Sequence, residues 1–174
     1  SAKVTPIQKS NVTFAEVASF GHRGFKERGI EKDVCEKFGV KVSYNAEGAI
    51  DTHYYPYGEG STVTGYKVRR LPKTFYWLGT QHGLFGKMLF NGGGKRVVIC
   101  EGEIDTLSVA QAYYTRNKNI YPVVGISSAT TLDPLLENRD WLRSFQEIVL
   151  FLDNDERGEE ATAKAIRILG VDKV

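Results

Sequence analysis

The sequence predicts an α/β protein in two parts, an α+β N-terminal lobe followed by a parallel sheet flanked by helices. Before residue 96, runs of β-branched and aromatic residues are separated by short glycine-containing turns, a pattern typical of antiparallel strands. From residue 96 onward, short apolar runs alternate with stretches of helical period, as expected where helices join buried parallel strands. With 174 residues, the chain has room for one ordinary domain or two lobes that share a core. We therefore predict subdomains at residues 1–95 and 96–174.

One helix and four strands are expected in the first part. Residues 1–20 are only weakly periodic, which predicts an arm or a loosely packed start. Ile30, Val34 and Phe38 recur every four residues and predict a helix over residues 31–38. The strands are expected at residues 41–46, 50–57, 62–70 and 75–78, with turns at residues 47–48 and 58–61 and an interruption at Pro72.

Strands and helices are expected to alternate in the second part. The predicted order is strand 97–100, helix 105–115, strand 121–126, loop 127–131, helical region 132–145, strand 148–152 and helix 156–169. We expect the strands to be buried on both faces. Gly170 ends the last helix, and residues 171–174 are predicted to begin another strand. This subdomain is therefore expected to be truncated at its C-terminus.

Composition excludes several classes of protein. No apolar run approaches the roughly 18 residues of a membrane span, and we expect neither a signal peptide nor a membrane partner. Cys35 and Cys100 are too few for a disulfide framework and no Cys–His spacing suits zinc, so we expect a cytoplasmic protein with no zinc in this chain. The net charge of +2 divides into +6 over residues 1–95 and −4 over residues 96–174. A surface for polyanions beside a site for divalent cations would explain this asymmetry, and so would two solvated lobes of opposite charge.

Two apolar strands of the second part lead into acidic residues. The first is followed by Glu101, Glu103 and Asp105, and the second by Asp153 and Asp155. In a parallel sheet, the carboxyl ends of the strands lie at one edge, where ligands bind. Carboxylates gathered there are unfavourable unless a cation lies between them, and their hard oxygens suit Mg²⁺ or Mn²⁺. All five residues are therefore candidate metal ligands.

Some of these acids also have a purely structural explanation. Asp105 and Asp155 each precede a predicted helix and could be N-caps. Glu101 and Asp153 end apolar strands, where an unpaired charge is costly, so they are the strongest candidates for a catalytic role. Of the five, Asp105 is the one most easily explained as a cap.

A basic row on the strand at residues 62–70 is the candidate site for the phosphates of a nucleotide. Lys67 and Arg69 are expected on one face of this strand, with Arg70 and Lys73 close behind. Such a row could hold a triphosphate, or it could be a solvated strand face.

Two further stretches could contact nucleic acid. Tyr76 and Trp77 could stack on bases of a template strand, although core packing explains them equally well, and Arg70 is the other residue expected to contact DNA. The polar loop at residues 127–131 follows a strand and could contact phosphates, or it could be a plain surface loop.

The two acidic segments resemble the signature motifs of the Toprim family, which includes bacterial-type primases, type IA and II topoisomerases and small nucleases. Residues 97–105 read VVICEGEID and residues 151–158 read FLDNDERG, which match the motifs E-G-x-x-D and D-x-D-x-x-G in the right order. The form EGEID is similar to the primase half of phage primase–helicases. Further similarity to that half lies in KVR at residues 67–69, LFGK at residues 84–87 and NGG at residues 91–93.

This resemblance implies synthesis of short RNA primers on a single-stranded DNA template by two-metal nucleotidyl transfer. It implies that Glu101 acts as general base or metal ligand and that Asp153 and Asp155 hold Mg²⁺ or Mn²⁺, with Glu103 and Asp105 assisting.

The resemblance also implies the substrates and partners. Ribonucleoside triphosphates would be held by lysines matching Lys67, Lys73 and Lys87. A zinc-binding template-recognition module and a helicase domain would lie outside this chain, and a phage-encoded protein would work in the host cytoplasm. Two alternatives remain open: a nuclease or topoisomerase fragment, and a catalytically silent DNA-binding Toprim module.

Overall fold

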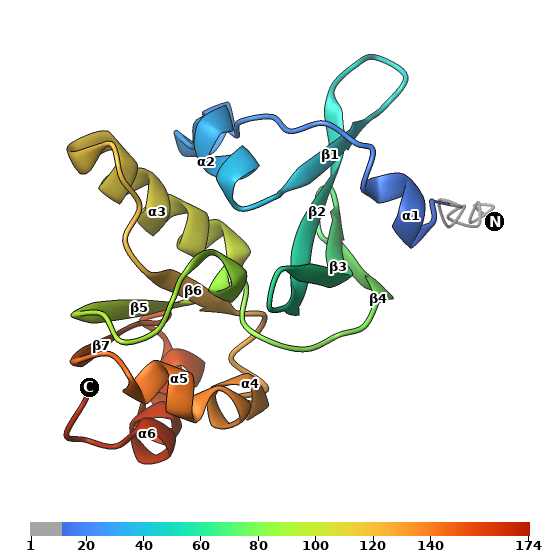
Figure 1. The fold of residues 1–174 in the computed structure, drawn as a ribbon. Coiled ribbons are helices and arrows are strands. Elements are labelled where there is room, and N and C mark those ends of the chain that lie inside the picture. The colour runs from blue at the N-terminus through green and yellow to red at the C-terminus, as the bar shows by residue number, and fades with distance from the viewer. Residues whose placement is uncertain (1–11) are drawn as a thin grey trace, which may run out of the picture.

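The computed structural model describes residues 12–174, which form two neighbouring sheets (Figure 1). The first sheet is antiparallel with strand order β1-β2-β3-β4, and the second is parallel with order β6-β5-β7. The strands are β1 (Lys41–Tyr44), β2 (Ile50–Glu59), β3 (Thr62–Arg70), β4 (Thr74–Gly79), β5 (Arg96–Glu101), β6 (Val123–Ile126) and β7 (Glu147–Phe151). The α-helices are α1 (Phe14–Val17), α2 (Lys32–Lys37), α3 (Glu103–Asn117), α4 (Asp133–Glu137), α5 (Arg139–Arg143) and α6 (Glu156–Leu169), with 3₁₀ turns η1 (Lys26–Arg28) and η2 (Lys87–Leu89).

The predicted fold class is confirmed, and most predicted elements lie within a few residues of their expected bounds. The long hairpin of β2 and β3 closes at Glu59 opposite Thr62, so its turn is shorter than predicted. No helix within residues 12–174 is both long and apolar enough to cross a membrane.

The N-terminal segment packs more tightly than predicted. Thr13 and Glu16 cap α1 reciprocally, each side chain accepting a hydrogen bond from the backbone N–H of the other residue. Val17 is fully buried in a small cluster with Tyr66 and its neighbours on the antiparallel sheet. The prediction of a loosely packed start is therefore wrong for this segment, and the part of it that concerns residues 1–11 lies outside the described residues.

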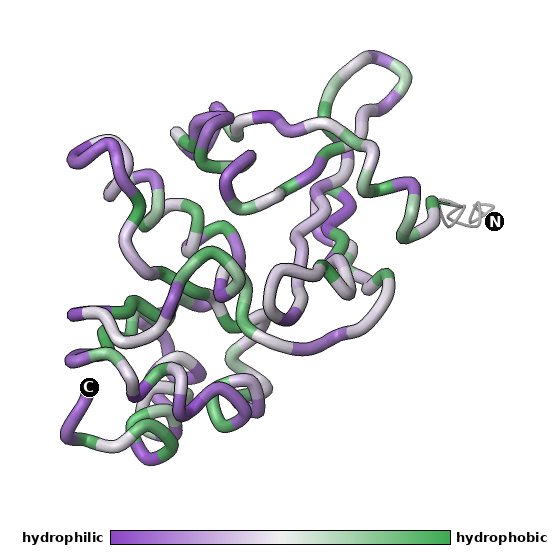
Figure 2. The backbone as a smooth tube through the Cα atoms, in the orientation of Figure 1, coloured by the Kyte–Doolittle hydropathy of each residue, from purple (hydrophilic) through white to green (hydrophobic). Residues whose placement is uncertain are grey.

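The parallel sheet lies between two layers of helix. In Figure 1, α3 lies on one face of the sheet and α4, α5 and α6 lie on the other. Along the central strand β5, Val97 and Ile99 face the α4–α6 layer, whereas Val98 and Cys100 face α3. The tube in Figure 2 is correspondingly green along the strands of this sheet.

One hydrophobic core crosses from the first half of the chain to the second. Val98 and Leu107 of the second half pack in the same cluster as Tyr57 of the first. Phe85 also forms a two-way backbone bridge with Gly125 of β6. The two sheets separate near the predicted boundary at residues 95–96, but the halves share a core, and the boundary stays a prediction.

Strand β7 is buried on one face only, contrary to the prediction. Val149 and Phe151 are 37 % and 58 % exposed because α3 packs on β5 and β6 and does not reach this edge strand.

The helical region predicted at residues 132–145 is confirmed, whereas the strand predicted to begin at residues 171–174 is wrong. The helical region at 132–145 is two short helices, since Asn138 leaves helical geometry between α4 and α5 and its side-chain amide bonds the Pro134 carbonyl at 2.8 Å. Residues 171–174 form a turn and not a strand, because the Lys173 N–H returns to the Gly170 carbonyl.

Candidate active site

The first acidic cluster is divided between a strand end and a helix start. Glu101 is the last residue of β5, and Gly102 then turns the chain with a φ of 81°, a conformation that favours glycine. The Gly102 N–H donates to the Ile126 carbonyl at 2.7 Å, which ties this turn to the neighbouring strand. Helix α3 begins at Glu103, and no side chain caps it. Asp105 lies within the first turn of α3, so its interpretation as an N-cap is wrong.

The second acidic cluster is fixed by the start of α6. Asp155 is the N-cap, and its Oδ1 accepts a hydrogen bond from the Gly158 N–H at 2.7 Å, which confirms the cap interpretation for this residue. A Cβ atom at Gly158 would lie 1.7 Å from the Asp153 carbonyl oxygen. Only glycine therefore allows the helix to start this close to Asp153, and this explains the spacing of the D-x-D-x-x-G motif.

Both clusters open onto one cleft at the carboxyl edge of the parallel sheet, where the antiparallel sheet faces it. The cleft has a volume of about 570 Å³. Eight predicted site residues line it: Glu101, Glu103, Asp105, Asp153, Asp155, Lys67, Arg69 and Lys73. The acidic clusters and the basic row of the sequence, which are far apart along the chain, are thus brought together.

Glu101 holds an unfavourable charge. Burial, a hydrogen bond with Asp153 and the negative charges of Asp153 and Asp155 raise the pKa of Glu101 from 4.5 to about 7. Its Oε1 atom is buried and has no hydrogen-bond partner among the described residues. Burial and Asp153 also raise the pKa of Asp105, an effect that Arg28 partly opposes. A bound cation would relieve this repulsion.

Glu103 differs from Glu101 in being fully partnered. Its Oε1 accepts a hydrogen bond from the Tyr57 hydroxyl at 2.6 Å, and the Lys67 ammonium lies 3.1 Å from Oε1 and 3.2 Å from Oε2. Lys67 also donates to the Ser127 carbonyl at 2.8 Å. Burial and the Glu103 carboxylate hold the pKa of Tyr57 well above its usual value, so the phenol stays protonated and remains the donor.

The acidic residues of the cleft fit a divalent cation, as the Toprim fold implies. Within residues 12–174, no three His, Cys, Asp or Glu side chains are already arranged around a single metal position. The donors present are nevertheless carboxylate oxygens, and Glu101 offers an oxygen that nothing else in the described chain satisfies. This chemistry suits a hard ion that keeps several waters in its shell, such as Mg²⁺ or Mn²⁺.

Three predicted site residues do not line this cleft. Lys87 donates to the Asn138 side chain at 2.6 Å and lies over the ring of Trp141. Trp77 packs edge-on against Tyr57, with ring centroids 4.9 Å apart, which matches the core-packing alternative. The third, Arg70, ends β3.

Sequence reasoning missed several residues that do line the cleft. Arg28, Arg157, Tyr55 and Phe75 are among them. Arg157 lies inside the D-x-D-x-x-G motif beside Gly158, and its position in that motif could have indicated it. Arg28 comes from a turn far along the chain, and no sequence pattern indicates its place here.

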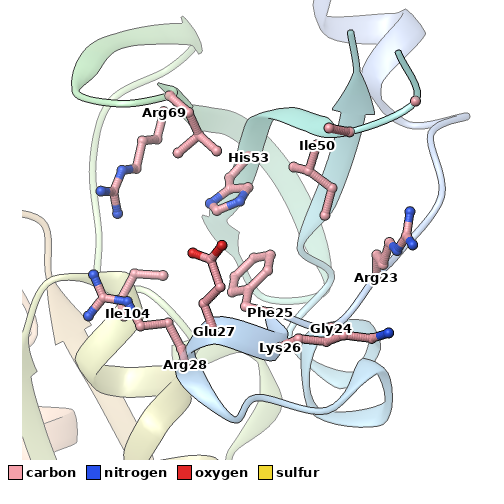
Figure 3. Close-up of a pocket in the computed structure, with 13 residues that line it drawn as sticks. Arg23, Gly24, Phe25, Lys26, Glu27, Arg28, Ile50, His53, Arg69 and Ile104 are labelled. Carbon is pink, nitrogen blue, oxygen red and sulfur yellow. The ribbon is translucent and has the colours of Figure 1, made fainter.

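A second, smaller pocket adjoins the cleft and shares part of its wall. It has a volume of about 380 Å³, and Arg28, Arg69 and Ile104 line both cavities. In Figure 3, Arg28 and Arg69 lie on the same side of this pocket, and the Glu27 carboxylate projects into it below His53. The His53 ring stacks on Phe25, and burial together with Arg69 lowers the pKa of His53 to about 4. The His53 ring is therefore neutral at neutral pH, so the charge of this pocket comes from the Glu27 carboxylate and from the arginine and lysine side chains that line it.

Comparison with known proteins identifies relatives of both halves. A family model described as Toprim-like matches residues 98–174. The DNA helicase/primase of Enterobacteria phage T3 is 30% identical over 155 residues, which are 84% of this chain and 26% of that protein. The chain thus spans about a quarter of the length of this relative.

Two solved structures resemble the whole fold. The crystal structure of the primase fragment of the bacteriophage T7 primase-helicase has a TM-score of 0.80 and 29% identity, covering 100% of this chain and 72% of that one. A chain from the bacteriophage T7 lagging-strand DNA polymerase in complex with primase domains bound to an RNA/DNA hybrid and dTTP has a TM-score of 0.77 and 30% identity, covering 92% and 81%. With its paired acidic motifs at the edge of the parallel sheet and this similarity along nearly its whole length, the chain belongs to the Toprim primases of phage primase–helicases.

Proposed function

We propose that this chain synthesises short RNA primers on single-stranded DNA by nucleotidyl transfer that depends on Mg²⁺ or Mn²⁺. One observation carries the proposal: the carboxyl groups of Glu101 and Asp153 share one cleft with the basic side chains of Arg69 and Lys73. A reaction that joins nucleotides needs both a cation site and a phosphate site at the same place.

Four carboxylates are the best candidates to hold the metal: Glu101, Asp105, Asp153 and Asp155. Glu103 is a weaker candidate because both of its oxygens already accept hydrogen bonds. When bound, divalent ions would activate the attacking hydroxyl and neutralise the charge that develops on the leaving pyrophosphate.

The side chains of the cleft divide the remaining tasks. Glu101 lines the cleft beside the other carboxylates, where it would accept the proton of an attacking 3′-hydroxyl or serve as a metal ligand. Arg69 and Lys73, together with Arg157 of the same cleft, hold the triphosphate of the incoming ribonucleotide; Lys67 belongs to the same basic row.

Three predicted contacts would be made away from the cleft. Arg70 and the exposed part of the half-buried Trp77 ring would contact the template along β3 and β4, and Lys87 would contact nucleotide only if substrate extends beyond the cleft.

The full protein is proposed to act with partners that this chain does not supply. A zinc-binding module would read the template, and a helicase domain would follow, as the name of the phage T3 relative suggests. The full protein would act in the cytoplasm of a host cell.

The test is an incubation with single-stranded DNA, labelled ribonucleoside triphosphates and Mg²⁺ or Mn²⁺. We expect labelled oligoribonucleotides from the wild-type chain and from Glu160→Gln, which removes an exposed carboxylate of α6 outside the cleft. We expect none from Glu101→Gln or Asp153→Asn. Shortening of the template without RNA product would indicate a nuclease instead. DNA binding with neither product would indicate a silent module.

A further inference from the structure

Glu103 sits at the centre of a buried hydrogen-bonded chain that joins four parts of the fold. Tyr57 comes from β2, Lys67 from β3, Glu103 from α3, and Ser127 from the loop after β6. The side chains of Lys67 and Glu103 are only 12% and 6% exposed, and Tyr57 is 1% exposed. This hydrogen-bonded network therefore links the antiparallel sheet to the parallel sheet directly beside the acidic cleft.

The charged and hydroxyl groups of this network already have hydrogen-bond partners. The Lys67 ammonium donates hydrogen bonds to Glu103 Oε2 and to the Ser127 carbonyl, and it lies 3.1 Å from Glu103 Oε1 in an ion pair. The two oxygens of Glu103 match Lys67 and the Tyr57 hydroxyl. Glu101, only two residues earlier, instead has a buried oxygen without any partner among the described residues. A metal could bind the unpartnered oxygen of Glu101 directly, whereas at Glu103 it would compete with the Tyr57 hydrogen bond and meet the positive charge of Lys67, and both disfavour a cation there.

The contact with Ser127 sets the orientation of a loop that lines the cleft. Because a peptide unit is planar, a Ser127 carbonyl directed at Lys67 forces the N–H of Ser128 to point away from Lys67. Ser127, Ser128 and Ala129 all line the cleft. Fixing one peptide plane therefore restricts the whole start of this loop.

We propose that Glu103 is a positioning residue rather than a metal ligand: supported by Tyr57, it anchors Lys67, and Lys67 in turn holds the Ser127–Ala129 loop at the nucleotide site. The effect on nucleotide affinity rests on the proposed function. The effects on metal binding and on the loop do not.

Metal affinity separates a ligand from a positioning residue. The double variant Glu103→Gln/Lys67→Met removes one negative and one positive charge, so the net charge of the cleft is unchanged. We expect its Mn²⁺ dissociation constant, measured by electron paramagnetic resonance titration, to stay within about 3-fold of wild type, whereas Asp153→Asn raises it at least about 10-fold. A loss in the double variant as large as that of Asp153→Asn would overturn the proposal.

Loop order tests the anchoring role without any need for catalysis. Tyr57→Phe removes only the hydroxyl group that supports Glu103, and Tyr54→Phe is the matched control, since Tyr54 is equally buried on the same strand but bonds Ser43. We expect amide hydrogen exchange of residues 127–129 to become about 5- to 10-fold faster in Tyr57→Phe and in the double variant, and unchanged in Tyr54→Phe. Unchanged exchange in both Tyr57→Phe and the double variant would refute the anchoring role.

Nucleotide binding supplies a third readout. Labelled ATP should bind about 5- to 10-fold more weakly to Tyr57→Phe, and adding Tyr57→Phe to the double variant should have little further effect, because the three residues act as one unit. If Tyr57→Phe lowered ATP affinity by the same factor in the wild type and in the double variant, the three residues would not act as one unit. If the wild-type chain binds Mn²⁺ but makes no primers, the proposed function fails, while the metal and exchange measurements still decide the role of Glu103.

Discussion

Replacing Glu101 by Gln should stabilise the metal-free protein at alkaline pH while abolishing its metal-dependent activity. The raised pKa of Glu101, about 7 against an ordinary value of 4.5, means that the folded state resists ionisation of this carboxyl more than the unfolded state does. Below about pH 4.5, both states hold the proton and the pKa difference has no effect on stability. As the pH rises from 4.5 to 7, only the unfolded state loses its proton, so the free energy of unfolding falls; above pH 7 the full penalty is present.

The magnitude follows from the shift. A difference of about 2.5 pKa units corresponds to a ceiling of about 3 kcal/mol, and partial exposure of the side chain with an exposed partner, Asp153, reduces this to about 1–2 kcal/mol. Glutamine keeps the shape of the side chain and cannot ionise. In EDTA at about pH 8, Glu101→Gln should therefore melt about 3–6 °C above wild type, and the difference should shrink toward zero near pH 5.

Thermal or urea unfolding of both proteins across this pH range, with and without Mg²⁺, is the assay. Mg²⁺ should stabilise the wild type and erase most of the difference at pH 8, because the ion neutralises the same repulsion. Glu103→Gln is the contrasting control: its carboxylate is paired with Lys67 and Tyr57, so its loss should destabilise the fold. If Glu101→Gln were less stable than wild type at pH 8, or if the difference did not change with pH, the electrostatic account of Glu101 would be refuted.

Three further predictions concern the rest of the cleft. Gly158→Ala would place a methyl group 1.7 Å from the Asp153 carbonyl oxygen, so urea unfolding should show a loss of more than about 2 kcal/mol, together with weaker Mn²⁺ binding; near-wild-type stability would contradict the close contact. Asp155→Ala should cost about 1 kcal/mol through the lost N-cap, whereas Asp155→Ser should keep most of that stability but still bind Mn²⁺ more weakly, which separates capping from metal binding. Lys73→Met should weaken ATP binding about 10-fold and Lys87→Met should not, since only Lys73 lines the cleft; equal losses would show that the nucleotide site extends toward Lys87.

The fold could be predicted because local patterns are strong in this chain. Apolar strands that end in acids, helices with a clear stripe and turns marked by glycine all gave elements close to those observed. The errors come from features that depend on distant packing. Phe151 is exposed because α3 covers β5 and β6 but not the same face of the edge strand β7, and Val17 of α1 is buried because it packs against Tyr54 and Tyr66 of the antiparallel sheet.

The sequence could predict which residues form the candidate site, but not which residues they contact. The motif alone cannot distinguish Glu101 from Glu103, since the two differ only in their partners, and those partners come from β2, β3 and the loop after β6. The same limit applies to caps. Asp105 and Asp155 have similar sequence contexts. Helix α3, however, begins at Glu103, directly after Gly102 and two residues before the predicted start at residue 105, so only Asp155 caps a helix.

The charge asymmetry along the chain has a simpler meaning in three dimensions. It suggested a surface for polyanions beside a site for divalent cations, and the structure places side chains of both signs in one cleft. Five acidic and five basic side chains line it: Glu101, Glu103, Asp105, Asp153 and Asp155 against Arg28, Lys67, Arg69, Lys73 and Arg157.

With no ligand bound, these formal charges cancel, and a triphosphate with about four negative charges gains little long-range attraction from the cleft. Two divalent cations would add four positive charges, which match the charge of that triphosphate. The positive charge of the metal ions and the negative charge of the nucleotide would then neutralise each other in the cleft. Pairing Lys67 with Glu103 removes one charge of each sign from this balance, and that is consistent with a supporting role for the pair and a reactive role for Glu101.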